Sequence, residues 1–309
     1  RDLHLSIRRQ RQMCIRDRSK ISKTYKEKGY VICDNLLPMS VVEELQNITD
    51  KIVNAGAALT ASDEVYEILD DLETKQSRIE RIKSPHTFEP CFDALIRRKE
   101  ITDVLHALLG PDIRLQNSKL NLKGKEGSAP VEWHQDWAFY PHTNDDVLAV
   151  GIMIDDMTED NGSVLFAPGT HRGPVYDHMS DGFFCGAVGA DVAKDLPNVS
   201  DTVTGKAGTV TFHHVRLLHA SKANLSGDPR RFVLYEVMAA DAWPLAGCSA
   251  VFESWDSMNE RMVIGKQSDV PRLVDVPVRI PQPLPPKVSS IFQLQRDGTN
   301  KYYMDETTS

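Results

Sequence analysis

The chain has 309 residues, of which 41% are hydrophobic and 26% charged, a composition typical of a globular protein with one large domain or two small ones. Its formal net charge of −8 argues against electrostatic nucleic-acid binding by the molecule as a whole. No apolar run approaches the roughly 20 residues of a membrane-spanning helix, so no membrane association is expected.

Residues 1–18 differ in character from the rest of the chain. They contain six Arg and two Asp, show no apolar period and lack the hydrophobic region of a secretory signal. We interpret them as a non-native or disordered extension. The remaining residues, 19–309, are predicted to form a single domain.

Helices are predicted in the first third of the chain. Residues 19–33 indicate a short helix followed by a strand. Residues 37–57 indicate a longer amphipathic helix, with Ser40 as its N-cap and Glu43 completing a capping box. Residues 90–110 indicate a further helix that stops at a Gly-Pro pair.

Short strands are predicted after Pro111. The stretches are "IRLQNSKLNLKG", "VLAVGIMIDD", "GSVLFAPGTH", "GTVTFHH" and "RRFVLYEVMAA", separated by Gly, Pro, Asn and Asp. This punctuation is typical of an all-β sandwich or barrel. We therefore expect a mainly β fold with flanking helices, in which a helical N-terminal part packs on a β core at about residues 111–245.

Two further regions are predicted to be loop-like. Residues 174–205 form a long insertion rich in Gly and Asp, and its length is typical of a lid. Residues 246–309 form a C-terminal extension, in which "PQPLPP" is stiff and the tail toward Ser309 is mobile.

The five cysteines are scattered, odd in number and include no CxxC pair. This usage is typical of a reducing compartment and argues against a disulfide framework or a thiolate zinc site. We expect a cytoplasmic protein with a small-molecule substrate. The sequence gives no indication of the oligomeric state.

The stretch "VEWHQDWAFY" holds an imidazole and a carboxylate two positions apart. In a strand, residues i and i+2 share a face, so His134 and Asp136 would present two ligands to one ion while Gln135 turns away. Alone, the pattern is weak evidence for a metal and is more often a surface pair or a salt-bridged histidine. A third ligand is needed, and the downstream candidates are His142, His171, His178, His213, His214 and His219.

His219 lies in "RLLHASKANLSGDPRRF", a strand-like run followed by a polar turn and a second strand. Two histidines and one carboxylate form the facial triad of non-heme Fe(II) oxygenases, whereas a structural zinc site takes four protein ligands. Arg230, eleven residues later, can bind the far carboxylate of a keto acid bidentately. Ser221 lies on the same face as His219 and adds a hydroxyl.

Together, WHQD, "NGSVLFAPGTHRG" and the H-x₁₀-R spacing resemble the phytanoyl-CoA dioxygenase family of Fe(II)/2-oxoglutarate oxygenases, over about residues 20–245. The resemblance implies a double-stranded β-helix core, a jelly roll of the cupin type. It implies that His134, Asp136 and His219 are catalytic residues that bind Fe(II), and that Arg230 binds 2-oxoglutarate. The reaction it implies uses O2, yields succinate and CO2, and takes ascorbate as an optional reductant.

The resemblance also suggests further co-substrate contacts. Ser221 and Gln135 match family positions near 2-oxoglutarate. Arg81 falls near a basic residue that contacts 2-oxoglutarate in some members, with Lys83 as the alternative. The presence of Asp136 favours hydroxylation, because related halogenases lack this carboxylate.

The substrate side is predicted from two features. The stretch "LQNSKLNLK" is similar to ectoine hydroxylases, in which a Gln reaches the active site, so Gln116 is a candidate substrate contact. Phe139, Tyr140 and Trp243 are aromatic candidates for the pocket, against plain core packing.

The predicted reaction is hydroxylation of an unactivated C–H bond of a small or medium-sized organic substrate. Two alternatives are kept at this point. One is a cupin-like metal-dependent hydrolase or isomerase, and the other is a catalytically silent binding protein of the same fold.

Overall fold

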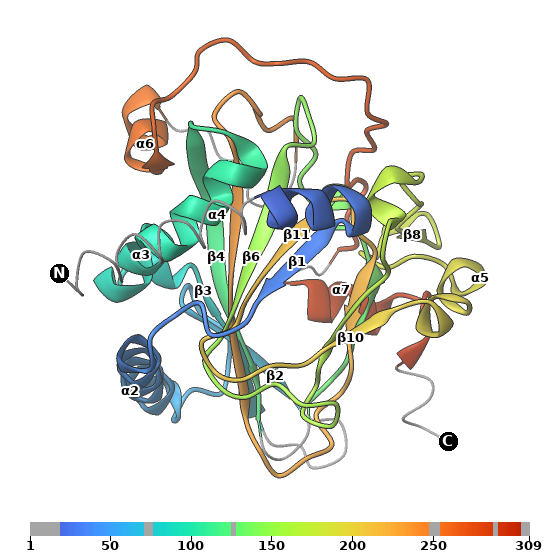
Figure 1. Ribbon diagram of the computed structural model, residues 1–309. Helices are drawn as coiled ribbons and strands as arrows, with labels where there is room; N and C mark the ends of the chain where they lie inside the picture. Colours follow the sequence, from blue (N-terminus) through green and yellow to red (C-terminus); the bar gives the residue numbers. More distant parts are fainter. Residues whose placement is uncertain (1–18, 71–76, 125–127, 247–253, 287–289, 304–309) are drawn as a thin grey trace, which may run out of the picture.

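A computed structural model describes residues 19–70, 77–124, 128–246, 254–286 and 290–303 (Figure 1). The extension predicted at residues 1–18 lies outside the described residues. Residues 19–28 are helical and lead into β1 (Tyr30–Cys33), as predicted. Among the described residues, no helix combines the length and the apolar character needed to cross a bilayer.

The predicted second helix is present as α2 (Met39–Gly56), but its start differs. Pro38, with extended backbone, occupies the N-cap position, and no side chain caps the first turn. Because the chain enters the helix directly after the proline, Ser40 is already helical and the predicted capping box is wrong.

The helix predicted over residues 90–110 is two helices, α3 (Pro90–Ile96) and α4 (Lys99–Leu109). Arg98 is extended, with φ −61° and ψ 140°, and this interrupts the helix. The neighbouring Arg97 guanidinium donates to Asp93 and to backbone carbonyls of the C-terminal segment, which secures the break. Gly110 ends α4 with φ 95°, as predicted.

Two antiparallel sheets form the centre of the molecule (Figure 1). The large sheet has the order β1-β11-β6-β13-β4-β3-β2, and β14 adds to β4; the small sheet has the order β10-β7-β12-β5. The large sheet contains β1, β2 (Tyr66–Asp70), β3 (Ser77–Lys83), β4 (Ile113–Lys123), β6 (Val147–Met153), β11 (Val210–His214), β13 (Arg230–Ala239) and β14 (Met262–Ile264). The small sheet contains β5 (Val131–His134), β7 (Val164–Phe166), β10 (Asp201–Val203) and β12 (His219–Ser221).

The remaining elements are short. They are η1 (Pro85–Thr87), η2 (Asp136–Ala138), η3 (Thr170–Arg172), β8 (Met179–Ser180), β9 (Phe183–Phe184), α5 (Ala190–Ala193), η4 (Leu196–Asn198), α6 (Trp255–Glu260) and α7 (Ile291–Asp297). A mainly β fold with flanking helices is thereby confirmed.

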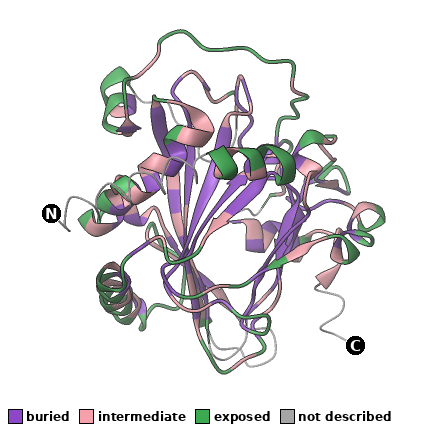
Figure 2. Cartoon of the chain, viewed as in Figure 1, coloured by how far each residue is buried: buried purple, intermediate pink, exposed green. Residues whose placement is uncertain are grey.

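The apolar core lies between the helices α2, α3 and α4 and the outer face of the large sheet. Fully buried Phe92, Leu105, Val150 and Val233 belong to this cluster, and all of β6 is buried (Figure 2). Each such side chain contributes about 1.5–3 kcal/mol to folding. The outer face of the large sheet buries its apolar side chains against the helices. The inner face, which points toward the small sheet, can therefore carry polar side chains.

Two parts of the sheet assembly were not predicted. The hairpin β2–β3 extends the large sheet, although "SRIERIK" is rich in charge. Residues 290–303 are not the mobile tail that was predicted, because α7 contacts β5 and buries Phe292, Leu294 and Gln295. Gln295 Nε2 donates to Gly186 O at 2.8 Å and its Oε1 accepts from Glu132 N at 2.9 Å.

Candidate active site

A cavity lies between the inner faces of the two sheets. The large sheet contributes Arg81, Lys119, Asn121, Ala149, His213, Arg230, Phe232 and Leu234 to its walls. The small sheet and the adjoining segments contribute Val131, His134, Asp136, Val164, His219, Ala220, Ser221 and Ile291.

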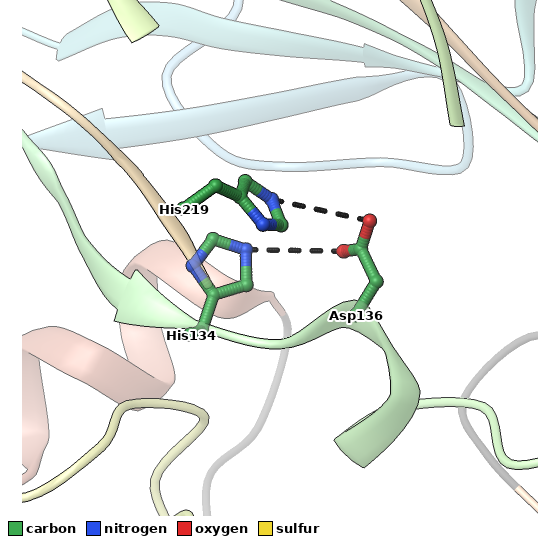
Figure 3. A group of neighbouring side chains, drawn as sticks. All are labelled: His134, Asp136 and His219. Carbon is green, nitrogen blue, oxygen red and sulfur yellow. Dashed lines mark ion pairs between the residues drawn. The ribbon is translucent and has the colours of Figure 1, made fainter. Parts of the chain in front are cut away.

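Three potential metal ligands meet on the small-sheet side of this cavity (Figure 3). His134 ends β5, His219 begins β12, and the two residues are paired in register. The Nε2 atoms of His134 and His219 lie 3.8 and 3.9 Å from the two carboxylate oxygens of Asp136. All three ligand atoms lie within 4.8 Å of one another, which suits a shared ion.

The carboxylate reaches this site by a different route from the one predicted. The strand stops at His134, and the chain turns through Gln135 into η2, where Asp136 is the first residue. The residues are therefore not i and i+2 of one strand. The turn brings the carboxylate over the imidazole, and it also sends the residues after Asp136 away from the cavity.

Both histidines have their Nε2 atoms free for a metal. His134 Nδ1 lies 2.7 Å from Glu132 O, and His219 Nδ1 lies 3.0 Å from Leu217 O. Because a carbonyl only accepts, each Nδ1 carries the proton and each Nε2 keeps its lone pair. Burial lowers the pKa of both imidazoles, that of His219 to about 4, so both are neutral at neutral pH, the form that binds metals.

Asp136 is the anionic member of the set. Burial alone would raise its pKa, but His219, His213 and Lys119 outweigh this effect and hold the pKa well below its usual range. Two neutral nitrogens and one carboxylate oxygen on one side leave the other coordination positions open. The donor set fits Fe(II) in a facial triad and does not resemble a closed zinc site.

His213 is a neighbour of the triad that sequence reasoning set aside. Its Nε2 lies 3.6 Å from Asp136 Oδ2, and its ring centroid lies 4.8 Å from that of His219. Both ring nitrogens are buried without a hydrogen-bond partner in the described part of the chain. The alternation of β11, in which one of two adjacent histidines must face inward, was the signal that could have identified it.

Arg230 lies on β13, across the cavity from β12, and is buried. Its Nε donates to Gly162 O at 3.0 Å, and Nη2 donates to the same carbonyl. Gly162 belongs to the "NGSVLFAPGTH" motif, and a Cβ there would lie 2.4 Å from Lys123 Cδ. The motif therefore holds the Arg230 side chain in position through the Gly162 carbonyl. Burial lowers the pKa of Arg230 to about 10, so it stays cationic at neutral pH.

Of the other predicted co-substrate residues, the structure brings Ser221 and Arg81 to the cavity. Lys83, the alternative to Arg81, instead donates to Asp63 O. Gln135 faces the insertion: its Nε2 donates to the carbonyls of Pro174 and Arg216, and its Oε1 accepts from Tyr176 N. Its side chain therefore holds the turn between the metal ligands in place, away from the cavity.

The four predicted substrate residues are not among the described residues that line the cavity. Phe139 and Tyr140 follow η2 into an apolar cluster. There the ring centroids of Phe139 and His134 lie 5.8 Å apart. Trp243 stacks on Trp255 and lies under the Arg114 guanidinium at 5.1 Å. Gln116 is buried in β4 where the register with β13 shifts, and beyond this bulge Lys119 and Asn121 face the cavity.

The insertion predicted as a lid contains β8, β9, α5 and β10, so it is not loop-like. Val188 N donates to Trp133 O, and Gln135 N donates to His178 Nε2, which fixes the insertion to β5 and the following turn. Within the described ranges, it supplies no residue to the cavity wall. Its motion as a lid stays a prediction.

Comparisons with known proteins agree with this geometry. Residues 25–232, more than half of the chain, match the family described as Phytanoyl-CoA dioxygenase (PhyH). The chain is 42% identical over 289 residues to the "Probable alpha-ketoglutarate-dependent hypophosphite dioxygenase" of Stutzerimonas stutzeri, covering 91% of this chain and 98% of that protein. It is 28% identical over 183 residues to the "L-proline trans-4-hydroxylase" of Streptomyces griseoviridis, covering 53% of this chain and 68% of that protein.

A solved structure supports the fold. The crystal structure of EctD from S. alaskensis with bound Fe superposes with a TM-score of 0.63 at 20% identity, covering 82% of this chain and 87% of that one. At 20% identity, this similarity supports the fold and nothing further. The predicted double-stranded β-helix core is confirmed by it and by the two facing antiparallel sheets.

Proposed function

The chain belongs to the phytanoyl-CoA dioxygenase family, and we propose that within this family it oxidises a small oxyanion that carries P–H bonds, such as hypophosphite. The protein is an Fe(II)- and 2-oxoglutarate-dependent dioxygenase, as its sequence predicted. Neither alternative, a hydrolase or isomerase or a silent binding protein, has support among these relatives. The observation that carries the substrate proposal is the 42% identity across nearly the whole S. stutzeri protein.

The charges of the cavity support an anionic substrate. Arg81, Lys119 and Arg230 line it, whereas Asp136 is its one acidic wall residue in the described part of the chain. A metal dication and the 2-oxoglutarate dianion balance each other, so the cationic walls have capacity for a further anion. The sequence alone suggested an organic substrate with a C–H bond. The cationic walls favour an anion, and the S. stutzeri relative favours a P–H bond.

The protein contributes binding, orientation and exclusion of water to the reaction. His134, Asp136 and His219 would hold Fe(II), which together with 2-oxoglutarate and O2 supplies the oxidant. Arg230 would bind the far carboxylate of 2-oxoglutarate through the N–H groups that Gly162 leaves free, with Ser221 as a neighbouring hydroxyl. Val131, Val164 and Phe232 form an apolar wall that limits access of water to the site.

The stoichiometry of the proposed reaction is defined. One oxygen atom of O2 enters a P–H bond and converts hypophosphite to phosphite. The other enters 2-oxoglutarate, which loses CO2 and becomes succinate. The test supplies purified protein with Fe(II), ascorbate, 2-oxoglutarate, O2 and hypophosphite, and follows phosphite by phosphorus NMR and succinate by chromatography.

We expect one phosphite to form per succinate, and we expect the His219→Ala variant to form neither product. Succinate release that hypophosphite does not stimulate, with no phosphite formed, would contradict the proposal.

A second candidate is C–H hydroxylation of a small organic acid, which is favoured by the similarity to the S. griseoviridis hydroxylase. The cationic walls would accept a carboxylate as well. The same assay with a panel of amino and carboxylic acids separates the two, because only a true substrate yields equal amounts of succinate and hydroxylated product.

The proposal includes a reducing compartment, the cytoplasm, as the scattered cysteines predicted. Cys33, Cys91 and Cys185 are free thiols in the structure, which agrees with this location.

A further inference from the structure

Lys119 is a cation in the cavity wall to which neither the sequence motifs nor the family resemblance assigned a role. It lies on β4 and faces the cavity together with Asn121. Its ammonium donates to Glu236 Oε1 at 3.0 Å, and their side chains are 21% and 5% exposed. An ammonium has three N–H donors, and Glu236 is the one acceptor that Lys119 meets among the described residues. Two donors therefore stay available to a ligand.

This ammonium lies on the part of the large sheet that faces the metal ligands. Its partner Glu236 is paired with Ala149, and Ala149 with His213, whose Nε2 lies 3.6 Å from Asp136 Oδ2. Lys119 lines the same cavity as His134, Asp136 and His219. Arg230 lies six residues before Glu236 on β13, farther along the strand from this rung.

Lys119 and Arg230 mark two separate positions along the cavity wall. In the β4–β13 ladder, Arg230 pairs with Lys123, while Lys119 pairs with Leu234, four residues farther along each strand. At about 3.4 Å per residue, the two rungs lie roughly 14 Å apart. One anionic group at Arg230 and a second at Lys119 can therefore be bound together.

The third cation of the wall is already engaged. Arg81 Nε donates to Asn121 Oδ1 at 3.0 Å, its guanidinium lies 3.6 Å from Glu67, and it packs over the Phe292 ring at 5.0 Å. Lys119 is thus a cavity cation with N–H donors available to a ligand, at a position separate from that of Arg230. Glu236 fixes its position and leaves its own Oε2 without a hydrogen-bond partner in the described chain.

We propose that Lys119 is the substrate anchor, whose ammonium binds the oxyanion of the substrate beside the metal while Arg230 binds the co-substrate. This inference rests on the proposed function only in taking the substrate to be a small anion. It assigns the specificity for that anion to β4, outside the metal-binding motifs.

The test compares three variants. Lys119→Met removes the charge and keeps the length of the side chain, and Lys119→Arg keeps the charge. Lys83→Met is the matched control, because Lys83 lies opposite Lys119 in the β3–β4 ladder but donates to Asp63 O. The readout is anaerobic calorimetry of protein loaded with Fe(II) and 2-oxoglutarate and titrated with hypophosphite, phosphite and formate in turn. A separate titration measures 2-oxoglutarate.

We expect Lys119→Met to weaken hypophosphite binding by about 10- to 100-fold, the size of a lost charge-assisted hydrogen bond. The dissociation constant of 2-oxoglutarate should change little, whereas the unfolding midpoint should fall, because Lys119→Met leaves the Glu236 carboxylate without its ion-pair partner. Lys119→Arg should recover part of the affinity, and Lys83→Met should match the wild type.

The outcomes separate the inference from the proposed function. Unchanged hypophosphite affinity in Lys119→Met, or a loss of 2-oxoglutarate affinity instead, overturns the anchor and leaves the reaction standing. If the wild type binds phosphite or formate through Lys119 but does not oxidise hypophosphite, the anchor stands and the proposed reaction fails. If the wild type binds none of the three anions, both fail.

Discussion

The two walls of the cavity are built in different ways. On the small-sheet side, His134, Asp136 and His219 come from two short motifs at the ends of β5 and the start of β12. On the other side, Arg81, Lys119 and Arg230 come from three strands, and Ile291 of α7, which packs on β5, completes the lining. The metal chemistry is therefore local in the sequence, whereas the substrate surface exists only after the large sheet and the C-terminal segment have assembled.

We expect the largest effect from removing a metal ligand, because this substitution alters only the small-sheet side of the cavity. Losing a partner that merely orients a ligand reduces metal affinity or activity by about 10- to 100-fold, so His219→Ala should reduce succinate release by at least about 100-fold. The thermal midpoint of the metal-free protein should hold, because His219 donates only to a carbonyl of its own segment. Substantial turnover at saturating Fe(II) would refute the triad.

Arg230→Ala tests the opposite wall and should raise the 2-oxoglutarate concentration needed for half-maximal rate by about 10- to 100-fold. Fe(II) affinity, measured by calorimetry, should stay near that of the wild type. Arg230→Lys should be intermediate, because an ammonium cannot bind a carboxylate bidentately. A loss of Fe(II) affinity in these variants would show that the walls do not act separately.

Gln295→Leu tests how far the C-terminal helix supports the wall. The substitution removes the hydrogen bonds of Gln295 with Glu132 N and Gly186 O, which should lower the free energy of unfolding by about 2–4 kcal/mol. Urea unfolding measures this, with Gln293→Leu as the control, because Gln293 is only half-buried and bonds within its own helix. If the two variants unfold alike, α7 contributes little to the wall.

The smallest effect concerns His142, which lies outside both walls. Burial lowers its pKa from 6.5 to about 4. Between these values the unfolded chain takes up a proton and the native protein does not, so stability is lost as the pH falls. From pH 7 to pH 5 this contributes about 2 kcal/mol, and His142→Gln should reduce the pH dependence of urea unfolding by that amount. An unchanged dependence would show that His142 does not stay neutral.

The difference between the two walls of the cavity also explains which features could be predicted from the sequence. The triad and Arg230 could be predicted because they lie in short motifs, and the structure brings the three ligand side chains together. The predicted substrate residues do not line the cavity, for two local reasons. The strand ends at His134, which sends Tyr140 into an apolar cluster, and the bulge beside Gln116 gives the cavity face of β4 to Lys119.

Nothing in the sequence near the motifs predicts that α7 contributes to the cavity lining. Ile291 and Phe292 lie about 70 residues beyond His219, and only the tertiary structure brings them to the cavity. The pairing of β2 with β3 was missed for another reason: the charged residues of β3, of which Arg81 faces the cavity, obscure the usual apolar alternation.

The docking of α7 has a practical consequence for protein production. A fragment that ends beyond β13, at about residue 245, would keep the three predicted metal ligands and Arg230 yet lose α7 and with it Ile291 of the cavity lining. The backbone N–H groups of Tyr302 and Tyr303 donate to the Glu132 carboxylate, two residues before His134. Because this contact lies close to the C-terminal end of the described chain, we expect an N-terminal affinity tag to disturb the active site less in kinetic work.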